Sequence, residues 1–171
     1  MINVFFSSDH LSVENLLTSI NLQENIEDIN VYYVRYASNQ KNEELLSIFS
    51  EKLNISIIDA TQDYLNACLD ISKRIPESDF YLFFDNADYF YDLFSAQNIV
   101  KFYNNQNFDV ADCFLLQTSS GSLSYTNNIY SKVFTKTFLE RIDYSSEKML
   151  NDLCSVTELY KIPDIILYEL H

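Results

Sequence analysis

The first 85 residues alternate between short β-forming runs and longer segments with helical periodicity. Strands are expected over residues 2–6, 29–36, 55–58 and 80–85. The first connection carries Val13, Leu16, Leu17 and Ile20 at the i, i+3, i+4 and i+7 positions of one helix face. Parallel strands need crossovers of this kind, so the βαβαβαβ order predicts a mainly parallel central sheet with helices on both faces. The expected fold class is a three-layer α/β/α domain.

The regular alternation weakens in the second half of the chain. The expected elements there are a helix over residues 89–103, a strand within 109–117, a short helix within 131–142, a helix after Ser145 or Ser146 and a strand over 162–168. Residues 118–128 are rich in Ser, Thr and Asn and are interpreted as a loop. The sequence has no internal repeat and no linker, so one domain over residues 1–171 is expected.

Composition and charge exclude several function classes. With 47% hydrophobic residues, including 13 Tyr and 13 Phe, the chain can bury a core. A net charge of -14 repels phosphate backbones and anionic lipids, which disfavours nucleic acid as a partner. Cys68, Cys113 and Cys154 lie far apart among apolar residues, which predicts reduced core thiols rather than a disulfide framework or a zinc site. These thiols, with no basic signal region and no apolar run of roughly 20 residues, predict a cytoplasmic protein.

The chain contains a single glycine, Gly121. Glycine-rich loops let backbone N–H groups approach a phosphate closely, and neither a G-x-G-x-x-G nor a Walker-type loop can be written here. Rossmann dehydrogenases and P-loop NTPases are therefore excluded, and a bound diphosphate would need a cation or side chains. A two-component receiver domain needs an acidic pair after its first strand, where Ser7 and Ser8 stand. A haloacid-dehalogenase phosphatase needs Asp-x-Asp at that same place, and the sequence does not have it there. Both of these classes are therefore disfavoured.

Two carboxylates follow directly after a buried strand. The apolar run Phe80–Phe84 is typical of a strand buried on both faces, and Asp85 and Asp88 come next. In open α/β sheets the ligand crevice lies outside the carboxyl ends of such strands. A β-turn over residues 85–88 brings its end Cα atoms within about 7 Å, so that both carboxylates reach one hard cation. The alternative is structural: Asp85 opens the turn and Asp88 caps the next helix.

Six segments along the chain carry, in order, the pattern of one enzyme family. They are residues 2–10, 31–38, Asn66, 81–88, 132–140 and 146–163. Residues 81–88, Tyr-Leu-Phe-Phe-Asp-Asn-Ala-Asp, resemble a strand with the Asp-x-Asp motif Leu-Phe-Leu-Asp-x-Asp-Asp. Residues 132–140, Lys-Val-Phe-Thr-Lys-Thr-Phe-Leu-Glu, resemble the segment Lys-Leu-Phe-Arg-Arg-x-Phe-Leu-Glu. Over nearly its whole length the chain resembles the GT-A nucleotide-binding domain of family 2 glycosyltransferases.

This resemblance implies a function, a cofactor and partners. Such enzymes transfer a sugar from a nucleotide-diphosphate donor to an acceptor hydroxyl, here an unknown glycan, lipid-linked or protein acceptor. A divalent metal, Mn²⁺ or Mg²⁺, stabilises the leaving diphosphate, and a carboxylate deprotonates the acceptor. Carried over by position, the metal ligands are Asp85 and Asp88, the base is Glu147, and the nucleotide-sugar contacts are Ser7, Arg35, Asn66 and Asp85.

The departures from the family pattern define a second hypothesis. Arg35 and Tyr36 stand where the family has the Asp that contacts the nucleotide base, and Ala87 occupies the third position of the Asp-x-Asp motif. Lys148 stands where the catalytic Asp is most common, which leaves Glu147 beside it. The alternative function is therefore a catalytically degenerate GT-A-like domain that acts as a binding or scaffold partner of an active transferase subunit.

Overall fold

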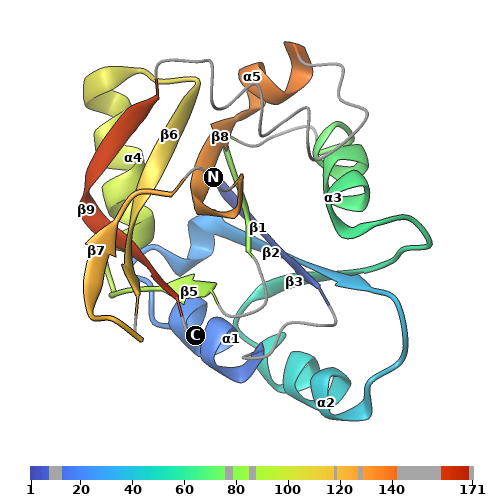
Figure 1. Cartoon of the computed structure of the whole chain (residues 1–171). Helices are drawn as coiled ribbons and strands as arrows, with labels where there is room; N and C mark the ends of the chain where they lie inside the picture. The colour runs from blue at the N-terminus through green and yellow to red at the C-terminus, as the bar shows by residue number, and fades with distance from the viewer. Residues whose placement is uncertain are drawn as a thin grey trace.

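A computed structural model describes residues 1–7, 13–75, 79–84, 88–117, 119–126, 129–141 and 159–169. The first half alternates strands and helices (Figure 1). Its elements are β1 (Ile2–Ser7), α1 (Val13–Asn21), a 3₁₀ turn (Ile26–Asp28), β2 (Ile29–Arg35), α2 (Gln40–Phe49), β3 (Asn54–Asp59), α3 (Tyr64–Ser72) and β4 (Phe80–Phe83). The predicted βαβαβαβ order is thus confirmed, with β4 ending at Phe83 and residue 85 outside the described residues.

The second half is richer in strands than its sequence predicts. Its elements are β5 (Asp88–Phe90), α4 (Ser95–Gln106), β6 (Val110–Gln117), β7 (Ser122–Ser124), a 3₁₀ turn (Ile129–Ser131), β8 (Lys132–Thr135), α5 (Lys136–Arg141) and β9 (Tyr160–Glu169). The strands predicted near residues 109–117 and 162–168 are confirmed as β6 and β9, and the short helix within 131–142 as α5. The helix predicted after Ser145 or Ser146 falls outside the described residues.

The described strands form one nine-stranded sheet with the order β3-β2-β1-β4-β8-β6-β9-β5, and β7 pairs with β6 outside this path. Strands β1 to β4 are mutually parallel. Strand β8 lies between β4 and β6 and is antiparallel to both. Strand β6 and its parallel neighbour β9 therefore run in the same direction as β1 to β4. Strands β5 and β7 run against them. The central sheet is therefore mostly parallel, as the sequence predicts.

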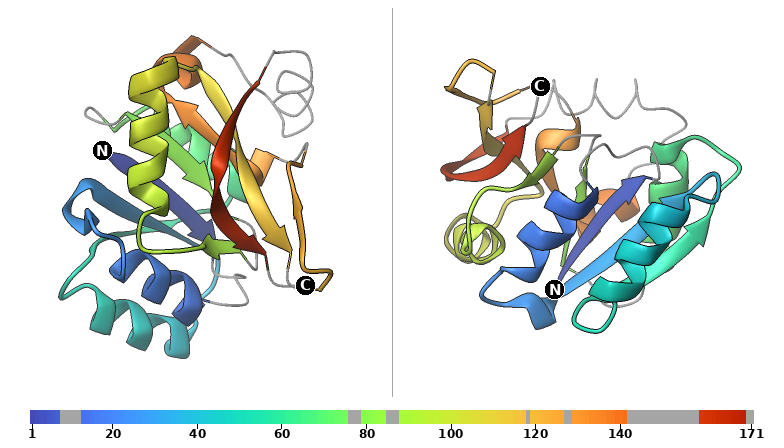
Figure 2. Two further views of the ribbon diagram at one scale, coloured as in Figure 1. Left: turned by 90° about the vertical axis from the view of Figure 1, so that its left-hand side faces the viewer. Right: turned by 90° about the horizontal axis from the view of Figure 1, so that it is seen from below.

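Two apolar cores lie on the two faces of the sheet, because successive strand residues point to opposite faces. Val4 and Phe6 of β1 pack with buried residues of α1, α2 and α4, whereas Phe5 packs with buried residues of α3 and α5. Figure 1 shows α1 and α2 below the strands and α3 and α5 above them, and the left view of Figure 2 shows α4 beside β6 and β9. The domain is a three-layer α/β/α structure.

The prediction of a helix over residues 89–103 is wrong in its first part. Tyr89 and Phe90 belong to β5, which pairs with β9, and α4 begins only at Ser95. Phe90 is buried, with its ring 5.4 Å from that of Phe84. This pairing joins segments about 80 residues apart in sequence, so local periodicity could not reveal it. Asp88 is consequently the first residue of a strand, and its alternative role as a helix cap is also wrong.

Two further strands lie where loop or helix was expected. Residues 122–124 form β7 within the predicted loop, and residues 132–135 form β8 ahead of the predicted short helix. Gly121 has φ = 62° in the connection between β6 and β7, and its N–H donates to Gln117 O at 2.8 Å. Asn107 ends α4 with φ = 49°, a left-handed position for which asparagine is the usual substitute for glycine. The scarcity of glycine is therefore compatible with these tight turns.

Candidate functional site

The parallel strands β1, β2 and β3 end together at one edge of the sheet. Ser7 pairs with Val34, and Arg35 pairs with Asp59, so these three carboxyl ends lie at a common level. Strand β4 joins them, because Phe5 pairs with Phe83 and the N–H of Phe84 donates to Phe5 O at 2.8 Å. The residue after Phe84 is Asp85. The structure thus brings Ser7 and Arg35 to the edge at which β4 ends, directly before Asp85 in the sequence.

Arg35 is held in place by acidic side chains on two elements. Its Nε and Nη2 donate to Oδ1 and Oδ2 of Asp59 at 2.6 and 3.0 Å, and its Nη1 donates to Glu43 Oε1 at 3.4 Å. The bidentate geometry fixes the plane of the guanidinium across the ends of β2 and β3. Sequence reasoning missed Asp59, although Arg35 lies near the end of the strand expected over residues 29–36 and Asp59 directly follows the one expected over 55–58, and a parallel sheet places such ends side by side.

Hydrogen bonding from Arg35 lowers the pKa of the Asp59 carboxyl below its ordinary value. A lowered folded-state pKa means that this pair contributes to stability above the ordinary Asp pKa and loses the contribution as the pH falls through the lowered value. Because the Asp59 side chain is 74% exposed, solvent screens the pair and its contribution is small. At neutral pH the site therefore presents an oriented, ionised Arg–Asp pair.

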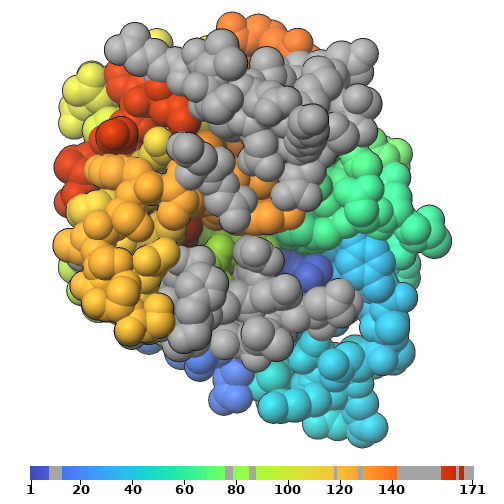
Figure 3. Space-filling view, in the orientation of Figure 1, coloured from blue at the N-terminus to red at the C-terminus, as the bar shows by residue number. Residues whose placement is uncertain are grey.

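A polar pocket of about 280 Å³ lies beside this pair, between the end of β3 and α3. Asp59, Thr61 and Gln62 line one end of it, and Asp70 and Arg74 of the α3 segment line another. The Gln62 amide donates to Asp70 Oδ2 at 3.0 Å. Figure 3 shows residues of α3, in green, bordering those around the end of β2, in light blue. The pocket therefore presents both anionic and cationic side chains next to the Arg35–Asp59 pair.

Asn66 lies in the first turn of α3, where its side chain serves the helix cap. Asp63 is the N-cap residue: its Oδ1 accepts from the Asn66 backbone N–H at 3.1 Å, and its Oδ2 accepts from Asn66 Nδ2 at 2.5 Å. This arrangement satisfies one of the unpaired N–H groups of the helix end. One amide N–H of Asn66 is thus used locally, and its side-chain carbonyl has no described donor.

Tyr64 joins α3 to β1 and to the end of β4. Its hydroxyl lies 2.8 Å from Phe5 O and 3.0 Å from Phe84 O, and donates its proton between these two carbonyls. Phe84 O is the last carbonyl before Asp85. No local pattern in the sequence points to this contact with β1 and β4. Tyr64 therefore positions the end of β4, the strand that precedes the acidic segment 85–88 in the sequence.

Replacing Tyr64 with phenylalanine is expected to lower the free energy of unfolding by about 1–2 kcal/mol, because two buried carbonyls lose their shared donor while the ring is kept. Urea unfolding followed by circular dichroism measures the change. The matched control is Tyr103→Phe. The Tyr103 ring packs edge-on against Phe80 at 5.0 Å, while its hydroxyl has no hydrogen-bond partner among the described residues. Equal losses for the two variants would contradict the role of the Tyr64 hydroxyl.

The remaining site residues are only partly described. Asp88 opens β5 with 7% of its surface exposed and pairs in register with Glu169 of β9. Asp85 and Glu147 fall outside the described residues. The pKa of the nearby Cys113 thiol is raised, chiefly by burial and further by the negative charges of Asp112 and Asp88. Carboxylate oxygens suit Mn²⁺ and Mg²⁺, but the described residues contain no group of three or more His, Cys, Asp or Glu that could hold a metal ion. A cation here would therefore need Asp85 as well as Asp88.

A buried ion pair joins the neighbouring strands β6 and β8. Lys132 Nζ donates to Asp112 Oδ1 and, at 3.1 Å, to Thr126 O. The Lys132 and Asp112 side chains are 1% and 7% exposed. Lys132 opens the segment 132–140 that resembles the family sequence, yet its charge is fully used inside the sheet. Its role in this structure is therefore to fix β8 against β6.

Comparisons with known proteins give similarity in structure only. No protein-family model matches the chain, and no curated protein matches its sequence. S. aureus TarS 1-349 in complex with UDP-GlcNAc aligns with a TM-score of 0.78 and 15% identity over 99% of this chain and 58% of that one. The mannosyltransferase PcManGT from Pyrobaculum calidifontis in complex with GDP-Man and Mn²⁺ aligns with a TM-score of 0.68 and 14% identity, over 99% and 55%.

A CMP:2-keto-3-deoxy-manno-octonic acid synthetase complexed with CTP also aligns, with a TM-score of 0.60 and 7% identity over 100% of this chain and 88% of that one. The chain spans somewhat more than half of the TarS fragment and of the mannosyltransferase. Within the described residues, no helix has the length and apolar character needed to cross a membrane. These likenesses establish the architecture: the chain has a GT-A-like fold, the fold of nucleotide-sugar transferases.

Proposed function

We propose that this protein binds a nucleotide-diphosphate sugar at the edge where β1 to β4 end and transfers the sugar to an acceptor hydroxyl. One observation carries the proposal. Strand β4 ends at this edge and the acidic segment 85–88 follows it in the sequence, in a fold whose similar solved structures include complexes with UDP-GlcNAc and with GDP-Man and Mn²⁺. The sequence resemblance to family 2 glycosyltransferases supports the same assignment. The acceptor, whether a glycan, a lipid-linked sugar or a protein, is not specified by these features.

The proposed roles of the residues follow from their chemistry. Asp85 and Asp88 would hold Mn²⁺ or Mg²⁺, which when bound supplies a Lewis acid for the leaving diphosphate. Ser7, Arg35, Asn66 and Asp85 would contact the nucleotide sugar, and Glu147 would take the acceptor proton. Because two carboxylates already hold Arg35, we expect the Arg35–Asp59 pair to bind the nucleotide as a unit, with donors from one residue and acceptors from the other.

A second candidate function is a GT-A-like domain without turnover that binds a partner transferase subunit. Ala87 in the acidic segment 85–88 favours this second function, because its side chain has no oxygen atom that could bind a metal ion. So does the use of Arg35 in ion pairs with Asp59 and Glu43. For either function we place the protein in the cytoplasm, since Cys68 and Cys113 are free, buried thiols of the kind that persists in reducing compartments.

Thermal unfolding with nucleotides and metal tests the first function. The protein is heated with Mn²⁺ or Mg²⁺ and each of UDP, GDP, CDP and TDP. A ligand at about 100 times its dissociation constant stabilises by about 2.7 kcal/mol, so the correct nucleotide should raise the melting temperature by about 5–10 °C. Asp85→Ala should abolish the rise. Asp28→Ala, at the opposite end of β2, is the matched control and should keep it.

The outcomes separate the two functions. A metal-dependent rise with one nucleotide, lost in Asp85→Ala, followed by hydrolysis or transfer of the corresponding sugar, supports the transferase. Absence of a rise with all four nucleotides counts against it. In that case a stable complex with a transferase, recovered by pull-down from the source cell, supports the scaffold function. A monomer that hydrolyses a nucleotide sugar ends the scaffold proposal.

A further inference from the structure

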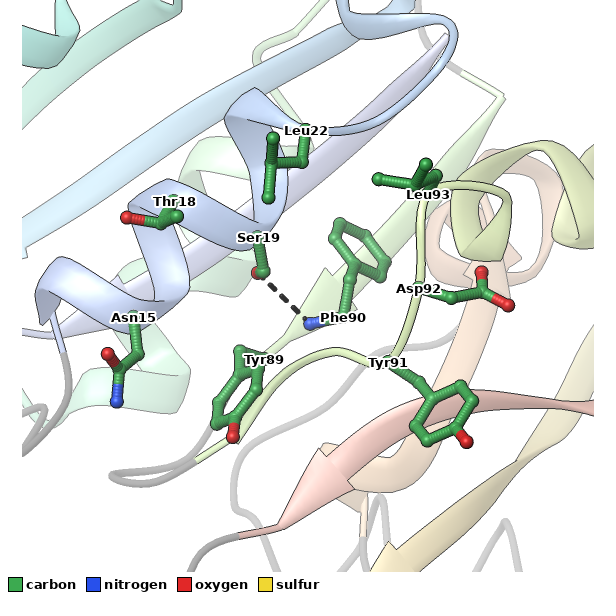
Figure 4. Close-up of a pocket in the computed structure, with 9 residues that line it drawn as sticks. All are labelled: Asn15, Thr18, Ser19, Leu22, Tyr89, Phe90, Tyr91, Asp92 and Leu93. Atoms are coloured by element: carbon green, nitrogen blue, oxygen red, sulfur yellow. Dashed lines mark hydrogen bonds between the residues drawn. The ribbon is translucent and has the colours of Figure 1, made fainter.

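A second pocket lies away from the edge formed by Ser7, Arg35 and Asp59. It has a volume of about 370 Å³ and opens between α1, β5 and the segment that leads into α4 (Figure 4). This size falls at the lower end of the range for small-ligand sites in proteins. None of the described residues assigned to the nucleotide sugar, Ser7, Arg35 and Asn66, lines it. The pocket is therefore a separate candidate binding site.

One wall of the pocket is polar and the opposite wall is aromatic. Asn15, Thr18 and Ser19 lie three and four residues apart and so share one face of α1. Tyr89 of β5 lies across from them, whereas the ring of Tyr91, which also lines the pocket, points away from α1 (Figure 4). The Asn15 and Thr18 side chains are exposed, and no described residue hydrogen bonds to them. A ligand between these walls would meet hydrogen-bonding groups on one side and flat apolar surfaces on the other.

Hydrogen bonds hold the two walls at a fixed separation. The N–H of Phe90 donates to Ser19 Oγ at 3.2 Å, and Phe90 itself is only 2% exposed. At the end of α1, Gln23 Nε2 donates to Asp92 O at 2.6 Å, while Gln23 Oε1 accepts from the N–H of Ala96 at 2.9 Å. A pocket with pre-set walls loses less conformational entropy when it binds a ligand.

The charges of the lining select against an anionic ligand. Among the described residues, the lining contains no Lys, Arg or His, and Asp92 is its charged residue. Asp92 Oδ1 accepts from the N–H of Phe94 at 2.8 Å and from Ser95 Oγ at 3.2 Å, so this carboxylate supports the start of α4. A phosphate or nucleotide would therefore meet a negative charge and no cation among these described lining residues, in a protein whose net charge is -14.

We propose that this pocket binds a neutral carbohydrate, with a sugar ring stacked on Tyr89 and its hydroxyls directed to Asn15 and Thr18, since the Ser19 hydroxyl already donates to Leu16 O and accepts from the N–H of Phe90. A pyranose has an apolar C–H face and a polar rim, which matches the two walls. The rim residues Leu22 and Leu93 are 54% and 43% exposed, and a bound sugar would cover part of this apolar surface. The proposal depends on the lining alone and holds whether or not the protein transfers sugar.

Titration of ¹⁵N-labelled protein with neutral methyl glycosides, of glucose, mannose and N-acetylglucosamine, tests the site by NMR. At least one glycoside should shift the amide signals of Ser19 and Phe90 saturably, while glucose 6-phosphate should bind more weakly. Tyr89→Ala should reduce the affinity about tenfold, the effect of losing one stacked aromatic ring. Tyr160→Ala is the matched control, because Tyr160 is a tyrosine at the start of another strand, β9, and is 44% exposed.

Three outcomes would overturn the proposal. They are the absence of saturable shifts with all three glycosides, shifts confined to Arg35 and Asp59, and tighter binding of glucose 6-phosphate than of the neutral sugars. Self-association that protects Leu22 and Leu93 in place of sugar binding would also overturn it. Tyr89→Ala should leave any nucleotide-dependent rise in melting temperature unchanged, so failure of this site is distinguishable from failure of the proposed transferase function.

Discussion

Lys132→Met is expected to lower the free energy of unfolding by about 3–5 kcal/mol, the usual cost of removing one partner from a buried ion pair. The Lys132 side chain is 1% exposed, and its ammonium is bonded to Asp112 and Thr126 O. Methionine keeps most of the side-chain volume but leaves the Asp112 carboxylate buried without its counter-charge. Urea unfolding followed by circular dichroism measures the loss.

Two further variants make this result specific to the charge. Asp112→Leu combined with Lys132→Met should recover most of the loss, because replacing both charges of a buried pair by apolar groups is often neutral. Lys101→Met, on the exposed face of α4, should change stability by no more than about 0.5 kcal/mol. If Lys132→Met cost no more than Lys101→Met, the pair would be accessible to water and the buried geometry described above would be wrong.

Phe5→Ala is expected to lower the free energy of unfolding by about 3–5 kcal/mol, the usual range for emptying the space of a buried phenylalanine. Phe5 has no exposed surface, and its ring centre lies 4.7 Å from that of Tyr32, 5.5 Å from Phe83 and 6.4 Å from Tyr81. These rings come from three adjacent strands, so the sheet is too constrained to collapse around the cavity. The same urea experiment measures the loss.

Phe94→Ala is the matched control for this truncation. Phe94 is 46% exposed ahead of α4, and its removal should cost about 1 kcal/mol or less. A similar loss for Phe5→Ala and Phe94→Ala would show that the ring cluster contributes little and that the α3 face of the sheet repacks. Phe5 O also accepts hydrogen bonds from the Tyr64 hydroxyl and the Phe84 N–H. The backbone structure of Phe5→Ala should therefore be compared with that of the native protein, so that the loss can be assigned to the ring and not to these hydrogen bonds.

The first half of the fold could be predicted from the sequence because each element carries its own periodic signal. Val13, Leu16, Leu17 and Ile20 are all buried on one face of α1, as their spacing indicates. The second half could not be predicted in this way, because short strands such as β5 and β8 are too short to show a periodic pattern and form only by pairing with strands distant in sequence. Phe90 is part of a strand through its pairing with Leu167, and Val133 through its pairing with Leu82 and Ala111.

For the candidate site, the sequence predicted the edge but not the contacts within it. It indicated that Ser7, Arg35 and the acidic turn follow parallel strands, and the structure places the described members of this set at strand ends as expected. It did not indicate that Arg35 binds Asp59 and Glu43, or that Tyr64 bonds to Phe5 and Phe84. The roles of Asp85, Asp88 and Glu147 stay predictions.

The sequence by itself determined the order of strands and helices in the first half, the apolar face of each element and the absence of a glycine-rich phosphate loop. These properties depend on neighbouring residues, and local spacing encodes them. The tertiary structure alone decided which strands lie next to one another in the second half, which charges are paired at the edge and that Lys132 is buried against Asp112. These are contacts between residues distant in sequence, and they depend on the packing of the whole sheet, which no local pattern specifies.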